Sequence, residues 1–334
     1  MSPFERFGLA LATTHPVEQV VAVARSADAI GVDAFWLAET YYHRSATPLA
    51  AAVGAATGRI AIGLGILPVH TRHPALLAME AATLDEATGG RIVLGLGVAR
   101  RVAELHGARL GLVGQMRRTV GAVRGLLDGE EVALDGPPFE MAATRIEVRP
   151  ARRIPIHIGT YASSRQMLRL AGQIADGVVY IWATPHLVRE AGEILGEAAE
   201  RAGRQMSSIA VAAYLIISLD EDARRARDAC RPLVATYARI VHEVWRRDGL
   251  ATEADLEPVL AAFGSGGPPA AAAAVSDALI EKVAIAGDPD YCRDRLGEYE
   301  GTGLTEPIAY EVFGPDPIAA LPRLATIVMR QCQP

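Results

Sequence analysis

The fold is decided by the stretch Gly89-Gly90-Arg91-Ile92-Val93-Leu94-Gly95-Leu96-Gly97. Paired glycines supply the left-handed residues that end a helix, and an arginine then opens a short apolar strand. The strand ends in Gly-x-Gly, where backbone can approach a flat ligand closely. We therefore expect a floor free of side chains at the carboxyl end of a buried strand. In a barrel of parallel strands, ligands bind at that end.

Length and composition indicate a globular protein with room for a large core. The chain has 334 residues, of which 50% are hydrophobic, and a formal net charge of -6. The acidic balance argues against nucleic acid or an anionic membrane as a partner. The three cysteines are far apart and form no C-x-x-C motif, so neither a zinc ribbon nor a disulfide framework is indicated. No signal peptide and no long apolar run is found, so we expect a cytoplasmic protein.

Apolar, β-rich runs alternate with helical patterns along the whole chain. These runs are continuous rather than alternating, which indicates strands covered on both faces. Eight such strands separated by helices are what a (β/α)₈ TIM barrel requires, here as a single α/β domain over residues 1–334. A doubly wound sheet is the alternative, but the first strand ends in Leu11-Ala12-Thr13-Thr14 rather than in a G-x-G-x-x-G turn. The predicted strands cover residues 7–12, 34–38, 59–67, 91–96, 154–158, 177–181, 209–218 and 307–312.

Two segments are longer than the minimal repeat. Residues 137–150 are predicted to form a small hairpin through Phe139 and Ile146. The longest insertion covers residues 220–285, between strands seven and eight, and contains helices around 221–246 and 253–263. Glycines and prolines of residues 264–269 then predict a flexible stretch, either a lid or a surface loop.

Seven short motifs occur along the chain: Phe7-Gly8-Leu9, Phe35-Trp36-Leu37-Ala38-Glu39, Gly63-Leu64-Gly65-Ile66-Leu67-Pro68, Thr71-Arg72-His73-Pro74, Gly89-Gly90-Arg91 with Gly95-Leu96-Gly97, Ala175-Asp176-Gly177 and Ile285-Ala286-Gly287-Asp288-Pro289. In this order they resemble the luciferase-like monooxygenase superfamily. Within it they are similar to the branch that uses the deazaflavin coenzyme F420, the methylenetetrahydromethanopterin-reductase-like enzymes. The resemblance covers nearly the whole chain, and it implies a TIM barrel, usually dimeric, with a flavin or deazaflavin in the C-terminal mouth.

The resemblance also implies which residues contact the cofactor. Family members that use F420 have a non-prolyl cis peptide at the end of the third strand, which here matches Gly65-Ile66. The segment from Thr160 to Arg165 opens a helix, where backbone N–H groups, serine hydroxyls and an arginine favour a phosphate group; Ser163 as a simple N-cap is the alternative. The full cofactor-binding set is Glu39, Gly65, Ile66, Gly97, Val98, Ala99, Thr160, Tyr161, Ser163, Ser164, Arg165 and Ile181.

Glu39, Tyr41 and His43 are the catalytic candidates, because they follow the second strand at the expected mouth of the barrel. A structural ion pair between Glu39 and Arg44 is the alternative, as is simple packing of the aromatic loop. Thr40 replaces a histidine that some family members use catalytically, which argues against a sugar-phosphate dehydrogenase.

No metal is expected. His70 and His73 have a spacing that could ligate zinc, but no third ligand is nearby.

The function that these patterns indicate is hydride transfer between F420 and a small organic substrate, in a homodimer. An FMN enzyme that uses molecular oxygen is the close alternative. A catalytically silent flavin-binding barrel and a glycosidase that pairs Glu39 with Glu311 are also compatible with the sequence. Methanopterin is not expected as the substrate, because Ala10 stands near the place where methanopterin reductases carry a carboxylate.

Overall fold

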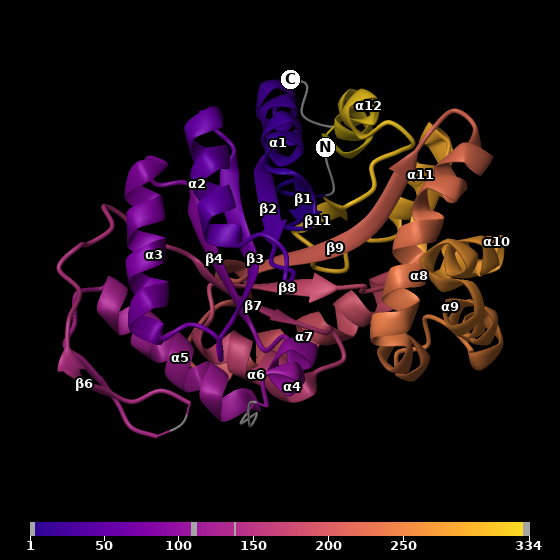
Figure 1. Ribbon diagram of the computed structural model, residues 1–334. Coiled ribbons are helices and arrows are strands. Elements are labelled where there is room, and N and C mark those ends of the chain that lie inside the picture. The colour runs from indigo at the N-terminus through magenta and orange to yellow at the C-terminus, as the bar shows by residue number, and fades with distance from the viewer. Residues whose placement is uncertain (1–3, 108–111, 137, 330–334) are drawn as a thin grey trace. The chain divides into compact units, whose positions relative to one another are not determined.

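The sheet has the strand order of a closed barrel. The computed structural model describes residues 4–107, 112–136 and 138–329. Strands hydrogen-bond in the order β10-β9-β11-β1-β2-β3-β4-β7-β8, and β9 also pairs with β8, so the predicted (β/α)₈ fold is confirmed (Figure 1). The eight barrel strands are β1 Gly8–Ala12, β2 Ala34–Ala38, β3 Ala61–Pro68, β4 Ile92–Gly97, β7 Ile156–Thr160, β8 Gly177–Ile181, β9 Ala210–Leu219 and β11 Glu306–Tyr310.

The chain divides into two compact units, which are described separately. The larger unit contains Gly8–Ile181 and Glu190–Ala212, and the smaller unit contains Met1–Phe7, Trp182–Arg189 and Ala213–Pro334. That the whole chain forms one domain stays a prediction.

Helices of the larger unit follow its parallel strands in turn. They are α1 Val17–Ile30, α2 Ala46–Ala56, α3 Pro74–Ala87, α4 Arg100–Leu105, α5 Leu112–Leu127 and α6 Arg165–Ile174. The chain that leads into α3 shows how local sequence sets a boundary: Pro74 occupies the first turn, and the imidazole of His73 accepts a hydrogen bond from the Ala75 amide. The paired glycines follow the end of α3 with left-handed φ angles of 68° at Gly89 and 82° at Gly90, as predicted.

Arg91 fastens the amino-terminal side of β4 to its neighbours. Its guanidinium donates hydrogen bonds to the carbonyl oxygens of Gly54 (2.8 Å), Thr57 (3.0 Å), Ile60 (3.0 Å) and Thr88 (2.7 Å). Arg91 therefore satisfies carbonyls at the end of α2 and around the start of β3, which would otherwise lack helical or ladder partners. Arg91 thus has a structural role in the fold.

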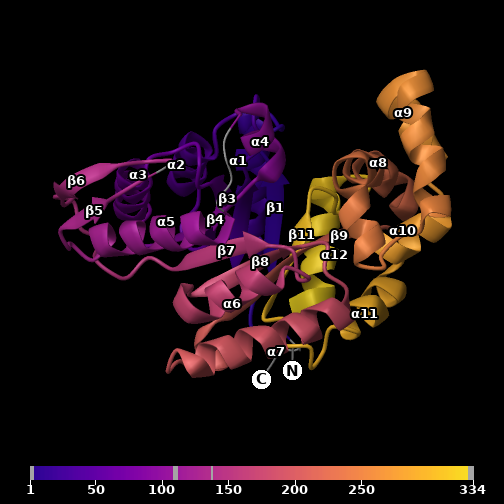
Figure 2. The same cartoon turned by 90° about the horizontal axis from the view of Figure 1, so that it is seen from below.

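A hairpin forms near the predicted segment, but its first strand comes earlier than expected, and neither Phe139 nor Ile146 lies in a strand. It pairs β5 Val132–Leu134 with β6 Met141–Thr144, and it lies beside α5 at the edge of the larger unit (Figure 2). Residue 137 lies outside the described residues.

In the smaller unit, the prediction of a flexible stretch over residues 264–269 is wrong. These residues lie within α9 Glu253–Ala274, which continues across a break at Gly267, where φ is 68°. Alanines 270–274 extend the helix beyond the break because their helix propensity is high. The helix packs against α8 Ala223–Arg247.

Three elements of the smaller unit are not predicted from the sequence, and a fourth is predicted only at its start. A strand, β10 Ala284–Gly287, pairs with β9, and α10 Asp277–Val283 precedes it. Two helices complete the smaller unit, α11 Pro289–Gly297, whose Asp288-Pro289 start is expected, and α12 Pro317–Met329. α7 Pro185–Arg201 and a 3₁₀ turn at Met206–Ser208 link β8 to β9.

Over the described ranges, no single helix is long and apolar enough to cross a membrane, and only α9 and α10 taken together, bent by 74°, meet that criterion by length and composition.

Candidate active site

The third strand bulges at its carboxyl end. The Gly65-Ile66 peptide bond is cis, as predicted, and the β3–β4 register shifts between Leu64 and Leu67. The side chain of Ile66 is displaced toward β4 and β7. A Cβ atom on Gly97 would lie 2.6 Å from an Ile66 carbon, and one on Gly159 would lie 2.4 Å from another.

These distances correct the expectation of a floor free of side chains. Gly95 and Gly97 are glycines because β3 crowds them: a Cβ on Gly95 would meet the Leu64 carbonyl oxygen at 2.3 Å. The half-exposed Ile66 side chain occupies the space that the glycines of β4 and β7 leave. The floor is therefore an apolar side chain resting on bare backbone, a surface suited to a flat ring.

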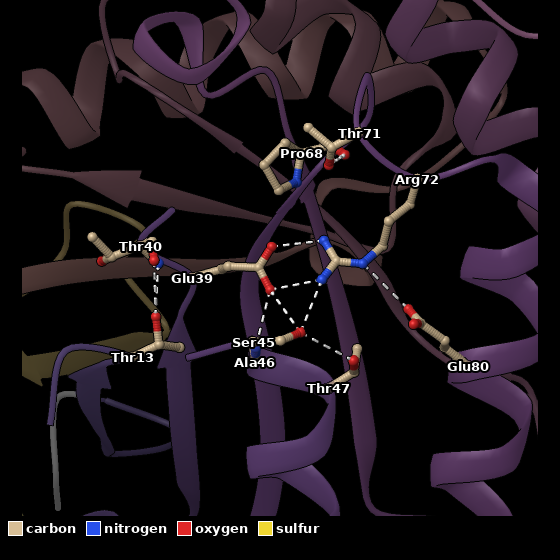
Figure 3. A network of polar contacts seen from close by, with 10 residues as sticks. All are labelled: Thr13, Glu39, Thr40, Ser45, Ala46, Thr47, Pro68, Thr71, Arg72 and Glu80. Carbon is tan, nitrogen blue, oxygen red and sulfur yellow. Dashed lines mark hydrogen bonds and ion pairs between the residues drawn. The ribbon is translucent and has the colours of Figure 1, made fainter. Parts of the chain in front are cut away.

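Glu39 forms a buried ion pair at the end of β2 (Figure 3). Its two carboxylate oxygens accept hydrogen bonds from the two terminal nitrogens of Arg72, at 2.6 and 2.8 Å. The side chains of Glu39 and Arg72 are only 4% and 12% exposed. The alternative ion pair between Glu39 and Arg44 is not formed, because the Arg44 guanidinium donates to the Thr14 carbonyl at 2.9 Å.

The same carboxylate holds the start of the next helix. It accepts a hydrogen bond of 3.0 Å from the Ala46 amide, at the first turn of α2. A carboxylate at a helix N-terminus is stabilised by the helix dipole. Arg72 also contacts Glu80 of α3 at 3.5 Å, so one buried network fixes the loops after β2 and β3.

A second contact fixes the loop after β2 to the loop after β1. The Thr40 amide donates to the Thr13 hydroxyl at 2.9 Å, and that hydroxyl donates to the Thr40 carbonyl. Thr13 is completely buried. The residues between Glu39 and Ala46 are therefore held at both ends.

The tyrosines of this loop lie in a cluster of rings. Tyr41 contacts Tyr42 and His106 edge-on, with ring centroids 6.2 and 5.2 Å apart. Burial raises the pKa of Tyr41, and a hydrogen bond with Thr71 partly opposes this. His106 was missed by the sequence analysis, because it follows α4 and no motif surrounds it. His43 is exposed, and its backbone amide donates to the Thr40 carbonyl.

His70 and His73 do not share a ligand. His73 caps α3 through one ring nitrogen, and its other nitrogen lies 3.3 Å from the Glu140 carbonyl. His70, which precedes Arg72 in the chain, contacts a different residue: its ring centroid lies 6.2 Å from that of His106. Among the described residues, no group of three metal-ligating side chains is close enough to hold an ion.

The segment after β7 opens α6 without a side-chain cap. Ser164, not Ser163, is the N-cap residue, and its hydroxyl makes no capping hydrogen bond. Its backbone amide donates to the Tyr161 carbonyl at 3.0 Å. The first-turn N–H groups of Gln166 and Met167 have no intrahelical partner, as at any helix start, and Arg165 is exposed beside them.

The remaining predicted cofactor residues lie at the same ends of their strands. Val98 and Ala99 follow β4, with Ala99 left-handed at φ 45°. Thr160 ends β7, and Ile181 ends β8. All of the predicted site residues belong to the larger unit. They lie in or just after the carboxyl-terminal parts of β2, β3, β4, β7 and β8, where a parallel barrel binds its ligands.

Comparison with known proteins gives the family. A model of the luciferase-like monooxygenases matches residues 1–306. The chain is 30% identical over 322 residues to a 5,10-methylenetetrahydromethanopterin reductase of Methanolobus tindarius, covering 93% of this chain and 95% of that protein. It is 31% identical over 207 residues to an F420-dependent glucose-6-phosphate dehydrogenase of Nakamurella multipartita, covering 59% of this chain and 60% of the relative.

A solved structure extends the likeness to the whole fold. The coenzyme F420-dependent tetrahydromethanopterin reductase of Methanopyrus kandleri superposes with a TM-score of 0.89 at 26% identity, covering 99% of this chain and 100% of that one. The resemblance inferred from the sequence motifs is confirmed, and the chain belongs to the luciferase-like monooxygenase family of enzymes, in its F420-dependent branch.

Proposed function

We propose that the protein is an oxidoreductase that exchanges a hydride between coenzyme F420 and a small organic substrate. The observation that carries this proposal is the similarity to an F420-dependent reductase over almost the full length of both chains. A Baeyer–Villiger monooxygenase of Pseudomonas putida solved with FMN supports the fold alone, because it is only 19% identical to this chain.

The residues present fit a deazaflavin. Ile66 offers an apolar surface at the end of β3, backed by the glycines of β4 and β7. Glu39 is predicted to shape the wall beside it through Arg72. Tyr161, Ser163, Ser164 and Arg165 lie at the start of α6, where the N-cap residue Ser164 makes no side-chain capping bond and the backbone N–H groups suit the phosphate group of the cofactor. We further assign Gly65, Gly97, Val98, Ala99, Thr160 and Ile181 to the cofactor pocket.

The bound deazaflavin supplies the electron chemistry, since its C5 accepts or donates a hydride. The chain's own residues position the reactants and exclude water. Tyr41 and His43 are the candidates for substrate contact on the loop after β2. Glu39 acts as a positioning residue, because Arg72 and the Ala46 amide engage its carboxylate oxygens.

The substrate is inferred to differ from the pterins named for the relatives. Ala10 is completely buried in β1, and none of the residues Gly8–Ala12 is ionisable. This strand therefore provides no acid for a pterin nitrogen.

Absorption titration with F420 and, separately, with FMN tests the proposal. Binding of F420 that is at least about a hundredfold tighter than that of FMN, a difference of about 3 kcal/mol, is the expected result. Tighter binding of FMN, with oxygen consumed during turnover, would replace the proposal with a monooxygenase. Binding of neither cofactor would refute both.

We also propose a homodimer that is joined through α2 and α3. Residues 46–56 of α2 include no charged side chain, and its exposed positions are small: Pro48, Ala51 and Ala55. The adjacent α3 exposes Leu76 at 44% and Met79 at 52%. Small residues on one helix and large ones on the next complement each other across a two-fold axis, so a second copy is the occupant this face fits.

A further inference from the structure

Two neighbouring arginines in the larger unit carry charges that the chain does not neutralise. Adjacent arginines occur five times in the sequence, and four of these pairs bind other side chains. Arg117 binds Gln173, Arg152 and Arg153 bind Asp85 and Asp176, Arg224 and Arg225 bind Asp228 and Asp220, and Arg246 and Arg247 bind Glu253 and Asp248. The fifth pair, Arg100 and Arg101, is exposed and makes no hydrogen bond or ion pair with any described residue.

The carboxylate nearest in sequence does not neutralise this pair either. The helix α4, which begins at Arg100, contains one acidic residue, Glu104. It follows Arg100 by four positions, a spacing at which opposite charges attract on a helix. No ion pair joins Glu104 to Arg100 or to any other residue within the described ranges. Two positive charges therefore remain at the start of α4, although the chain as a whole has a net charge of -6.

The pair directly follows residues that we assign to the cofactor pocket. Val98 and Ala99 connect β4 to Arg100, and Ala99 has a left-handed φ of 45°, which is unusual for a residue with a side chain. Strained backbone of this kind is concentrated at functional sites. β4 pairs with β7 as far as Gly97 and Gly159. The segment with the two arginines and the segment assigned to the cofactor phosphate therefore begin on neighbouring strands.

We propose that Arg100 and Arg101 bind the γ-glutamyl tail of coenzyme F420. FMN ends in its phosphate, whereas F420 continues beyond the phosphate into lactate and a chain of γ-linked glutamates, each with a free carboxylate. Guanidinium groups bind carboxylates through charge and through paired N–H donors. The two arginines thus contribute to the choice of F420 over FMN. This inference rests on the proposed function, because it takes F420 as the cofactor.

Three deazaflavins test the assignment in fluorescence titrations: F420 with its glutamate tail, the glutamate-free form, and the ribityl deazaflavin that also lacks the phosphate. We expect Arg100→Ala/Arg101→Ala to weaken the binding of tailed F420 about tenfold, as the loss of two exposed ion pairs. Affinity for the other two compounds should be unchanged. Arg100→Lys/Arg101→Lys keeps both charges and should keep most of the affinity for tailed F420.

Two controls separate a specific site from the general effect of charge. Arg25 and Arg169 are also exposed, belong to the same unit and bind no described side chain. Arg25→Ala/Arg169→Ala removes the same total charge and should bind tailed F420 as the wild type does; an equal loss in this control would overturn the inference. The effect of the Arg100 and Arg101 variant should also shrink in about 1 M salt, where charges are screened beyond about 3 Å.

The compounds distinguish failure of this inference from failure of the proposed function. An equal loss for the tailed and glutamate-free forms would place the two arginines against the phosphate or the lactate, and no loss for either form would leave them without a part in binding; both results overturn the inference. A wild type that binds none of the three deazaflavins refutes the proposed function. A wild type that binds all three with an affinity independent of the tail leaves the function standing and overturns the inference alone.

Discussion

Glu39 and Arg72 form an ion pair that links the loops after β2 and β3. Replacing Glu39 with Gln removes the charge that compensates a nearly buried guanidinium. We expect the free energy of unfolding in urea to fall by about 3 kcal/mol, because breaking a buried pair leaves an uncompensated charge. Arg44→Ala is the control, since Arg44 contacts a carbonyl and not Glu39.

The same Glu39→Gln variant tests the catalytic alternative. Turnover that falls by about 10²–10⁴ with unchanged stability would make Glu39 an acid or base. Weaker F420 affinity with turnover preserved at saturation would agree with the positioning role.

Arg165 is predicted to bind the cofactor phosphate beside the start of α6. Arg165→Ala should weaken F420 binding by about 1–3 kcal/mol, the loss of one charged hydrogen bond. Arg169, also exposed and one turn later on α6, provides the matched control in Arg169→Ala. Equal F420 affinities in the two variants would move phosphate binding elsewhere.

His70 gives stability a dependence on pH. Its folded pKa lies below the ordinary value of 6.5, so the unfolded chain binds the proton more readily. Stability is therefore full above pH 6.5 and falls as the pH decreases below it, in the range set by the lowered pKa. Urea unfolding at about pH 7.5 and about pH 5.5 should show a smaller loss for His70→Phe than for the wild type. His106 contacts this ring and lowers its pKa further, and it is retained in both proteins.

At the scale of the elements, the Ile66 side chain of β3 determines which residues fit in β4, because it lies against Gly97. Gly97→Ala would place a Cβ 2.6 Å from an Ile66 carbon, and we expect a loss of about 1–3 kcal/mol from overpacking, together with weaker F420 binding. Adding Ile66→Ala should restore stability if the clash is the cause. Gly121→Ala, on α5 with nothing within 4 Å of the added atom, should stabilise the protein by about 0.5–1 kcal/mol.

The elements and the bulge could be predicted because they depend on local signals. Continuous apolar runs identified all eight barrel strands, and the motif around Gly65 matched a family position. The partner of Glu39 could not be predicted, because Arg44 is closer in the chain while Arg72 is closer in space. His106 has no local signal, since its role depends on loops that meet only in the folded barrel. The prediction of a flexible stretch over residues 264–269 was wrong, because glycine and proline indicate that a helix is interrupted but not how many residues the interruption includes.

At the scale of the whole molecule, the proposed dimer is the property to test. Leu76→Glu places a charge on the apolar α3 face, and burying it in an interface would cost several kcal/mol. We expect light scattering after size exclusion to give a dimer mass for the wild type and a monomer mass for the variant. Ile318→Glu, at a position on α12 that is similarly exposed at 47%, should remain dimeric. A wild-type monomer would refute the interface.

Arg91 has a consequence for how the protein is made. The carbonyls that it gathers belong to Gly54, Thr57, Ile60 and Thr88, and every one of them precedes Arg91 in the chain. Once this arginine has left the ribosome, its complete set of partners has already been synthesised. The last barrel strand in the chain, β11, is translated more than two hundred residues later, and it pairs between β9 and β1. The guanidinium can therefore organise the α2–β3–β4 region during translation, well before the barrel itself is able to close.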